Sequence, residues 1–268
     1  MKTDQNRDLP TTRKEQFFDC LQYQYDILLK IGIVLVVCFA PLILVDVLRE
    51  MNAAAFYDEL RQNQITEEQY RDLMLLSKRI TGVYRIGGLL LLSLGVAGLL
   101  NIVKHICWRE PISFGGCFLD GVKGNYKTCL AIFTIMGVVL FMIESLQDSA
   151  MDGFLIPAYI SVWGVFFPIM MLMLCVESVY EVGFFENMKN SALLFFSTLI
   201  RTILATAVCF SPLILLALRS FSFKYLMISA VIIVFFPVGG LKWFLYCLEV
   251  FDRYINDRYP ELKRRGLS

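Results

Sequence analysis

The chain has 268 residues, of which 57% are hydrophobic and 18% are charged, and its mean hydropathy is +0.61. Soluble domains average about 45–50% apolar and about 25% charged residues, so this chain has too few ionisable groups to solvate a globular surface of its size. The composition excludes a disordered chain, a collagen-like fibre and a disulfide-rich secreted module, and a net charge of +1 gives no basic field for nucleic acid. It indicates an integral membrane protein.

Six apolar stretches are long enough, or nearly so, to cross a bilayer as helices. A spanning helix needs about 20 mainly apolar residues, because no water in the hydrocarbon core can satisfy bare backbone groups. The shorter stretches borrow flanking residues such as Lys30 and Lys242, whose long side chains reach the interface. The sequence therefore predicts an all-α, polytopic, single membrane domain with six transmembrane helices. The predicted spans are 31–45, 86–103, 128–143, 153–176, 202–218 and 225–241.

Lys and Arg are distributed unevenly between the two predicted sides of the membrane. The side with both termini carries 17 of the 25 Lys and Arg residues, and the other side carries 8. Because basic loops tend to stay in the cytoplasm, both termini are predicted to be cytoplasmic. Three segments lie outside the spans: an amphipathic cytoplasmic N-terminus over 1–30, an extracytoplasmic helical insert over 46–85 and a cytoplasmic tail over 242–268.

A six-residue pattern recurs before the first, third and fifth predicted spans. Its shared order is aromatic, apolar, acidic, any residue, aliphatic, and then Gln or Lys. This repetition predicts three helical hairpins in one orientation, each opened by a short amphipathic helix at the inner interface. The alternative is chance, because short patterns of common residue types recur in hydrophobic chains. The three copies are Phe17-Phe18-Asp19-Cys20-Leu21-Gln22, Phe118-Leu119-Asp120-Gly121-Val122-Lys123 and Phe184-Phe185-Glu186-Asn187-Met188-Lys189.

Capping residues mark the start of several predicted helices. Thr12 with Glu15 forms a capping-box pattern before the first span, and Ser113 suits a helix start before the third. Thr66 with Gln69 marks another start inside the extracytoplasmic insert. The insert is either a soluble-side element that contacts a partner or an extension that lengthens the second span, and we favour the extension.

The sequence offers little catalytic or metal-binding chemistry. Its one histidine, His105, lies at a predicted helix end, so an intramembrane serine protease is not indicated. The chain contains no HExxH, Walker or GxGxxG motif. A metal site built from His105, Cys107 and Cys117 would lack one ligand and have irregular spacing. We therefore predict no enzymatic activity, no metal and no cofactor.

The spans also lack the charges that coupled transporters usually carry in mid-membrane. Asp46, Glu144 and Glu177 lie at span margins, where we interpret them as solvated interfacial carboxylates. Several prolines lie within or at the edge of predicted spans, where they kink helices, and kinked helices can line a cavity. A small-solute transporter or channel through the kinked bundle is therefore the alternative function. The prolines are Pro41, Pro157, Pro168, Pro212 and Pro237.

The predicted cytoplasmic face is richer in charged and aromatic residues than the rest of the chain. This composition suits a docking surface for a cytoplasmic or membrane partner. Anchoring to anionic lipid is the alternative, because bases beside a membrane span are expected from orientation alone. The candidate partner contacts are Trp108, Arg109, Glu110, Phe118, Asp120, Lys123, Phe184, Glu186 and Lys189.

The second cytoplasmic loop and the tail resemble the YesL-like family of bacterial membrane proteins of unknown function. The resemblance rests on Trp108-Arg109-Glu110 with the run 118–125, and on Phe251-Asp252-Arg253-Tyr254-Ile255-Asn256 with the run that follows it. It implies a bacterial cell membrane location and an association with carbohydrate uptake, since such proteins are often encoded beside sugar ABC transporters. The expected function is a non-enzymatic accessory or scaffold component, with the lipid bilayer and sugar ABC transporter subunits as partners.

Overall fold

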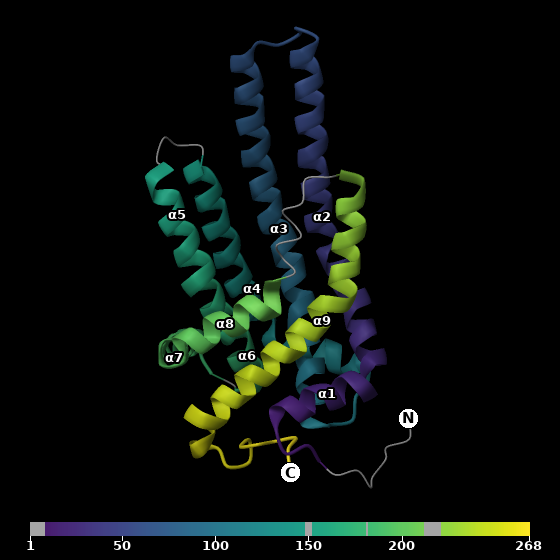
Figure 1. The fold of residues 1–268 in the computed structure, drawn as a ribbon, viewed down its shortest axis with the longest axis vertical. Helices are drawn as coiled ribbons and strands as arrows, with labels where there is room; N and C mark the ends of the chain where they lie inside the picture. Colours follow the sequence, from purple (N-terminus) through teal and green to yellow (C-terminus); the bar gives the residue numbers. More distant parts are fainter. Residues whose placement is uncertain (1–8, 148–151, 181, 212–220) are drawn as a thin grey trace.

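The computed structural model describes residues 9–147, 152–180, 182–211 and 221–268, and every regular element in these ranges is a helix (Figure 1). A π-helical turn at Val162–Phe166 joins α5 to α6, and a 3-10 turn at Asn256–Arg258 follows α9. The helices are α1 (Arg13–Tyr23), α2 (Tyr25–Arg61), α3 (Glu67–Trp108), α4 (Phe114–Gln147), α5 (Asp152–Ser161), α6 (Phe167–Val179), α7 (Phe184–Ser197), α8 (Leu199–Phe210) and α9 (Phe221–Tyr254).

The helices have the length and composition of membrane spans, which confirms the predicted all-α polytopic fold. The described residues contain five helical segments long and apolar enough to cross a bilayer, counting α5, the π turn and α6 as one. The pair α7 and α8 makes a sixth if it is one span, although it bends by 100° at Thr198. The rest of the predicted span 202–218, with Pro212, and loop residues 148–151 and 219–220 lie outside the described residues.

The central helix is α3, which packs against α2, α4, α6 and α9. In its most apolar stretch 61% of the residues are buried, whereas the corresponding figure for α2 is only 22%. Side chains such as Val37, Leu91 and Ile160 are therefore exposed on the outside of the bundle, where hydrocarbon rather than water is the favourable solvent. Small residues bring the helices close together: a Cβ added at Gly88 would lie 2.7 Å from the Leu42 side chain.

The segment 46–85 consists of extensions of α2 and α3 on either side of a short turn, as the favoured interpretation predicted. The two helices project together beyond α4, α5 and α9 in Figure 1. The predicted capping box at Thr66 is present, because its side chain accepts from the Gln69 N–H and the Gln69 side chain accepts from the Thr66 N–H. Thr12 likewise accepts from the Glu15 N–H, but the Glu15 carboxylate bonds Thr11 instead.

Two of the three predicted short opening helices are separate elements, and one is not. A break at Gln24 separates α1 from α2, and the break at Thr198 separates α7 from α8. The second element is wrong as predicted, since α4 continues without a break from Phe114, directly after Ser113. The physical reason is close packing: Gly121 lies so near α3 that an added Cβ would be 2.8 Å from the Ala97 carbonyl oxygen. That contact keeps the first turns of α4 upright beside α3.

The C-terminal segment also differs from its prediction as a tail beginning at residue 242. Helix α9 continues through the predicted end of the sixth span to Tyr254, and its last turns enter the largest hydrophobic core. Trp243, Phe244 and Phe251 are among the most completely buried large side chains of the described residues. The segment 242–254 is therefore part of the helical bundle, because its large side chains belong to the core and Trp243 contacts Met171 of α6 and Phe210 of α8.

Candidate interaction surface

The nine predicted partner contacts all lie at the end of the bundle that holds α1, which is the base of Figure 1. This end, called the α1 end below, is formed by α1, the last turns of α3, α6 and α9, and the first turns of α4 and α7. The residues that follow α9 return to it, and the Ser268 N–H donates to the Pro10 carbonyl. The fold therefore gathers the three predicted contact segments at one end.

Trp108, Arg109 and Glu110 contact other parts of their own chain. Arg109 adopts a left-handed conformation (φ 56°) at the end of α3 and forms an ion pair with Asp19 of α1 at 2.5 Å. Glu110 forms an ion pair with Arg265 at 2.5 Å, and the Arg265 guanidinium lies 4.1 Å from the centre of the Trp108 ring. These three residues thus fasten α1 and the C-terminal segment to the end of α3, a role that their sequence context did not reveal.

A polar cluster that we call the clasp joins α1 to the C-terminal segment. Arg13 is buried, forms an ion pair with Asp252 at 2.7 Å and donates to the Arg265 carbonyl at 3.0 Å. Asp252 in turn accepts from the Arg264 N–H at 2.9 Å. Gln16, one turn after Arg13, is fully buried and donates to the Cys107 carbonyl at 2.5 Å. Because a buried charge is costly without a partner, the clasp holds these segments in one arrangement.

The sequence analysis missed the clasp residues. A signal for one of them existed, since Gln16 precedes Cys20 by four residues and so lies on the face of α1 that carries a buried cysteine. A polar side chain on an apolar face is informative because burial without a hydrogen bond would be costly. Its partners, however, are 91 and 250 positions away and follow only from the fold.

The three copies of the six-residue pattern agree in burial at four of their six positions. The fourth position is buried in each copy: Cys20, Gly121 and Asn187. The second position is a large apolar residue that is exposed in each copy. The first position is half-buried and the sixth is exposed. This agreement favours true repetition over chance. The exposed fractions at the second position are 58% for Phe18, 56% for Leu119 and 78% for Phe185.

The remaining predicted contacts follow from this arrangement. Phe118 and Phe184 occupy the first position and pack partly into hydrophobic cores. The four charged candidates, which occupy the third and sixth positions of the second and third copies, are exposed at the surface. They are Asp120, Lys123, Glu186 and Lys189. The candidates therefore divide into residues that hold the α1 end together and residues that remain available to an external surface.

Asn187 belongs to a hydrogen-bonded network between α4, α6 and α7. Its side-chain amide donates to the Met173 carbonyl at 3.1 Å and to Glu177 at 3.2 Å, and its oxygen accepts from Ser191. Glu177 also accepts from the Thr128 hydroxyl at 2.8 Å. Glu177 is thus hydrogen-bonded within the bundle rather than simply solvated as predicted.

The other two carboxylates at span margins are also paired, at the opposite end from α1. Asp46 of α2 forms ion pairs with Lys224 of α9 at 2.7 Å and with Arg49 at 2.9 Å. Glu144 of α4 pairs with Arg85 of α3. These carboxylates are therefore half-buried and ion-paired, and the pairs Asp46–Lys224 and Glu144–Arg85 each join two neighbouring helices. The buried ammonium of Lys224 also reaches Glu50 at 2.7 Å.

His105 is occupied by contacts within the chain. Its Nδ1 lies 2.8 Å from the Asn101 carbonyl oxygen, and its Nε2 lies 3.3 Å from Glu110. Since both ring nitrogens have partners, the imidazole presents no free nitrogen to a substrate in this arrangement. Across the four described ranges, no three His, Cys, Asp or Glu side chains are grouped as a metal site requires.

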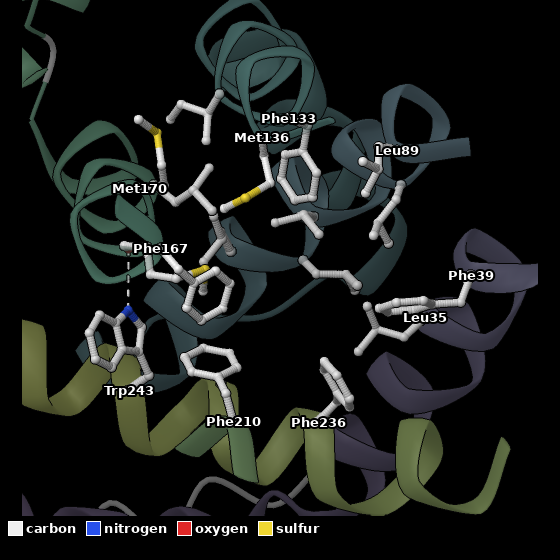
Figure 2. Close-up of a pocket in the computed structure, with 18 of the residues that line it drawn as sticks. Leu35, Phe39, Leu89, Phe133, Met136, Phe167, Met170, Phe210, Phe236 and Trp243 are labelled. Carbon is white, nitrogen blue, oxygen red and sulfur yellow. Dashed lines mark hydrogen bonds between the residues drawn. The ribbon is translucent and has the colours of Figure 1, made fainter. Parts of the chain in front are cut away.

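A cavity of about 260 Å³ lies in the middle of the bundle, where α2, α3, α4, α6, α8 and α9 converge (Figure 2). Its lining is made of Leu, Ile, Val, Phe, Met, Trp, Pro and Gly residues. The lining side chains carry two polar groups, the indole N–H groups of Trp163 and Trp243, and that of Trp243 donates to the Met171 carbonyl at 3.3 Å. The lining residues therefore include no charged side chain that could bind a polar solute.

Comparison of the chain with protein-family models, with curated proteins and with solved structures found no match.

Proposed function

We propose that this chain is a non-enzymatic, multi-pass protein of the bacterial cell membrane that acts as an accessory or scaffold component. In this proposal the α1 end faces the cytoplasm and docks a subunit of a carbohydrate ABC transporter. The observation that carries the proposal is the common exposure of the three motif copies, which place a large apolar side chain and a polar or basic side chain outward at the same end.

The exposed positions suit both a lipid interface and a protein partner. An amphipathic element with outward Phe or Leu and flanking Lys lies at the boundary between headgroups and acyl chains. Lys123 and Lys189 are exposed and add positive charge at that boundary. A partner subunit in the same membrane would contact these side chains laterally. The clasp supports this role because it fixes α1 relative to α3 and α9, so the surface is preorganised.

The experiment is site-specific photo-crosslinking in bacterial cells that also produce a sugar ABC transporter. A photoreactive phenylalanine analogue replaces Phe185 in one variant, and it replaces Tyr57, which is exposed at the far end of α2, in a control variant. We expect a transporter subunit to be linked from position 185 and not from position 57. Crosslinks to lipid alone from position 185, or equal linkage from both positions, would contradict the docking role.

The predicted orientation has its own test. The excess of Lys and Arg on the α1 side supports a cytoplasmic α1 end. A fluorescent protein that matures only in the cytoplasm, fused after Ser268, should therefore be bright. A dark fusion together with an active periplasmic phosphatase fusion at the same position would reverse the proposed orientation.

The alternative function, a small-solute transporter, receives no support from the cavity. A polar solute needs hydrogen-bonding or charged groups to replace its hydration, and the lining offers apolar side chains. Among the prolines of the described helices, Pro237 lines this cavity, so its kink shapes an apolar space.

A further inference from the structure

The cavity in the middle of the bundle has a wall that leads from its exposed edge to its buried base. Trp163 at the edge is 44% exposed, whereas Trp243 is 1% exposed. Between them the rings of Phe167 and Phe210 form a continuous series, with centroid distances of 5.3, 5.2 and 5.7 Å. Figure 2 shows Phe167, Phe210 and Trp243 on one side of the space, with Phe133 and Met136 of α4 across from them.

The residues that line the cavity extend along two helices over a length similar to the thickness of one leaflet. Its lining runs from Ile31 to Leu42 on α2, which corresponds to about 16 Å at 1.5 Å per residue, and from Leu89 to Val103 on α3, or about 21 Å. One leaflet of the hydrocarbon core is about 15 Å thick. The space therefore extends over the depth that one acyl chain occupies in a leaflet.

The surroundings and the lining define the chemistry of the occupant. The outside of the bundle is in contact with hydrocarbon, so acyl chains are present at the edge of the cavity at very high concentration. Phe and Met side chains provide polarisable contacts for a flexible apolar chain, and no buried polar group has to be left without a partner. Water gains nothing there, because apolar cavities of this kind stay dry and accept hydrocarbon.

From these observations we propose that the cavity is a binding site for one acyl chain of a bilayer glycerophospholipid. The chain enters past Trp163 and lies along the aromatic wall towards Trp243, and its headgroup stays at the membrane surface. This proposal needs only the membrane location of the bundle, and it is independent of the docking role of the α1 end.

The test uses Trp243 as a reporter, because its near-complete burial shields it from lipid on the outside of the bundle. Trp108→Phe and Trp163→Phe leave Trp243 as the one tryptophan of the full chain, which has three. The purified protein is reconstituted in phosphatidylcholine vesicles whose acyl chains carry bromine, a contact quencher, or do not. We expect Trp243 to lose fluorescence in the brominated vesicles. Unchanged Trp243 fluorescence would overturn the proposal.

A matched pair of variants shows whether the quencher acts from within the cavity. Gly240 lines the cavity and a Cβ added there meets no atom within 4 Å, so Gly240→Leu is chosen to occupy part of the space. Gly87 has the same free space around its Cα but is exposed on α3, so Gly87→Leu is the control. We expect the first variant alone to restore Trp243 fluorescence. Equal quenching in both variants would overturn the proposal.

A second measurement keeps the test valid if a variant does not fold. The chain with all three tryptophans is compared with Trp243→Phe in the same two kinds of vesicle. In Trp243→Phe, bromine can remove only the fluorescence of Trp108 and Trp163. The fluorescence intensity that bromine removes should therefore be larger in the unmodified chain, by the part of the Trp243 emission that is quenched. If bromine removes the same intensity from both folded proteins, Trp243 is not quenched, and this result would count against acyl-chain entry.

Discussion

Replacing Gly121 with alanine tests the close contact between α3 and α4. A Cβ added at Gly121 would lie 2.5 Å from the Asn101 Cβ and 2.8 Å from the Ala97 carbonyl oxygen. The second of these atoms is backbone, so only a shift of one helix can relieve the overlap. Overpacking of this kind costs about 1–3 kcal/mol. The added methyl group also raises helix propensity by about 1 kcal/mol, which has to be separated from the clash.

Gly124, in the same helix, provides that separation. A Cβ added there meets nothing within 4 Å, so Gly124→Ala carries the propensity gain without the clash. The free energy of unfolding should therefore be lower for Gly121→Ala than for Gly124→Ala by about 1–3 kcal/mol. Reversible titration with SDS in mixed micelles, followed by circular dichroism, measures both values. Equal stability of the two variants would refute the inference that α3 and α4 touch at Gly121.

Three further predictions concern buried polar groups. Arg13→Ala removes the central side chain of the clasp and should lower the free energy of unfolding by about 3–5 kcal/mol. As a control, Lys263→Ala removes an exposed ion pair and should change the free energy of unfolding by less than about 1 kcal/mol in the same SDS titration. Burial, with a smaller contribution from Asp19, raises the pKa of the Cys20 thiol from 9.0 to about 12. The folded state therefore holds the neutral thiol. Its contribution to stability is complete below pH 9 and is lost as pH rises towards 12. The difference in unfolding midpoint between the unmodified chain and Cys20→Ala should therefore change between pH 9 and 12 and stay constant below pH 9. Lys224→Met leaves two neighbouring carboxylates without their ammonium partner and should lower the free energy of unfolding by about 3 kcal/mol or more near neutral pH; a variant as stable as the unmodified chain would show that this ion-pair cluster does not hold α9 to α2.

Local signals predicted most of the fold because membrane helices are determined by short-range properties. Apolar length gave the spans, and the pattern Thr66 to Gln69 gave a helix start that the structure confirms. The recurring motif predicted three equivalent elements, and their burial agrees at the first, second, fourth and sixth positions, although the second copy is not a separate helix. Local patterns could not show that α4 runs unbroken past Gly121, because this depends on contact with α3.

The candidate surface was predicted only in part, for a physical reason that its residues make clear. Trp108, Arg109 and Glu110 have the composition of an exposed loop. Arg109, however, pairs with Asp19, which is 90 positions away, and Glu110 pairs with Arg265, which is 155 positions away. Ion pairs over such separations follow from tertiary packing alone. The exposed apolar residues of the motif, by contrast, could be recognised from the sequence, because the motif is a local pattern of six consecutive residues.

The unbroken course of α3 has a mechanical consequence. Its 42 residues make a rod about 63 Å long, roughly twice the thickness of the hydrocarbon core, and no proline interrupts it, whereas α2 and α9 each contain one. A tilt imposed on the projecting tip near Glu67 is therefore carried along the rod and displaces Trp108 at its other extremity. The two extremities of the bundle are therefore mechanically connected by one continuous helix.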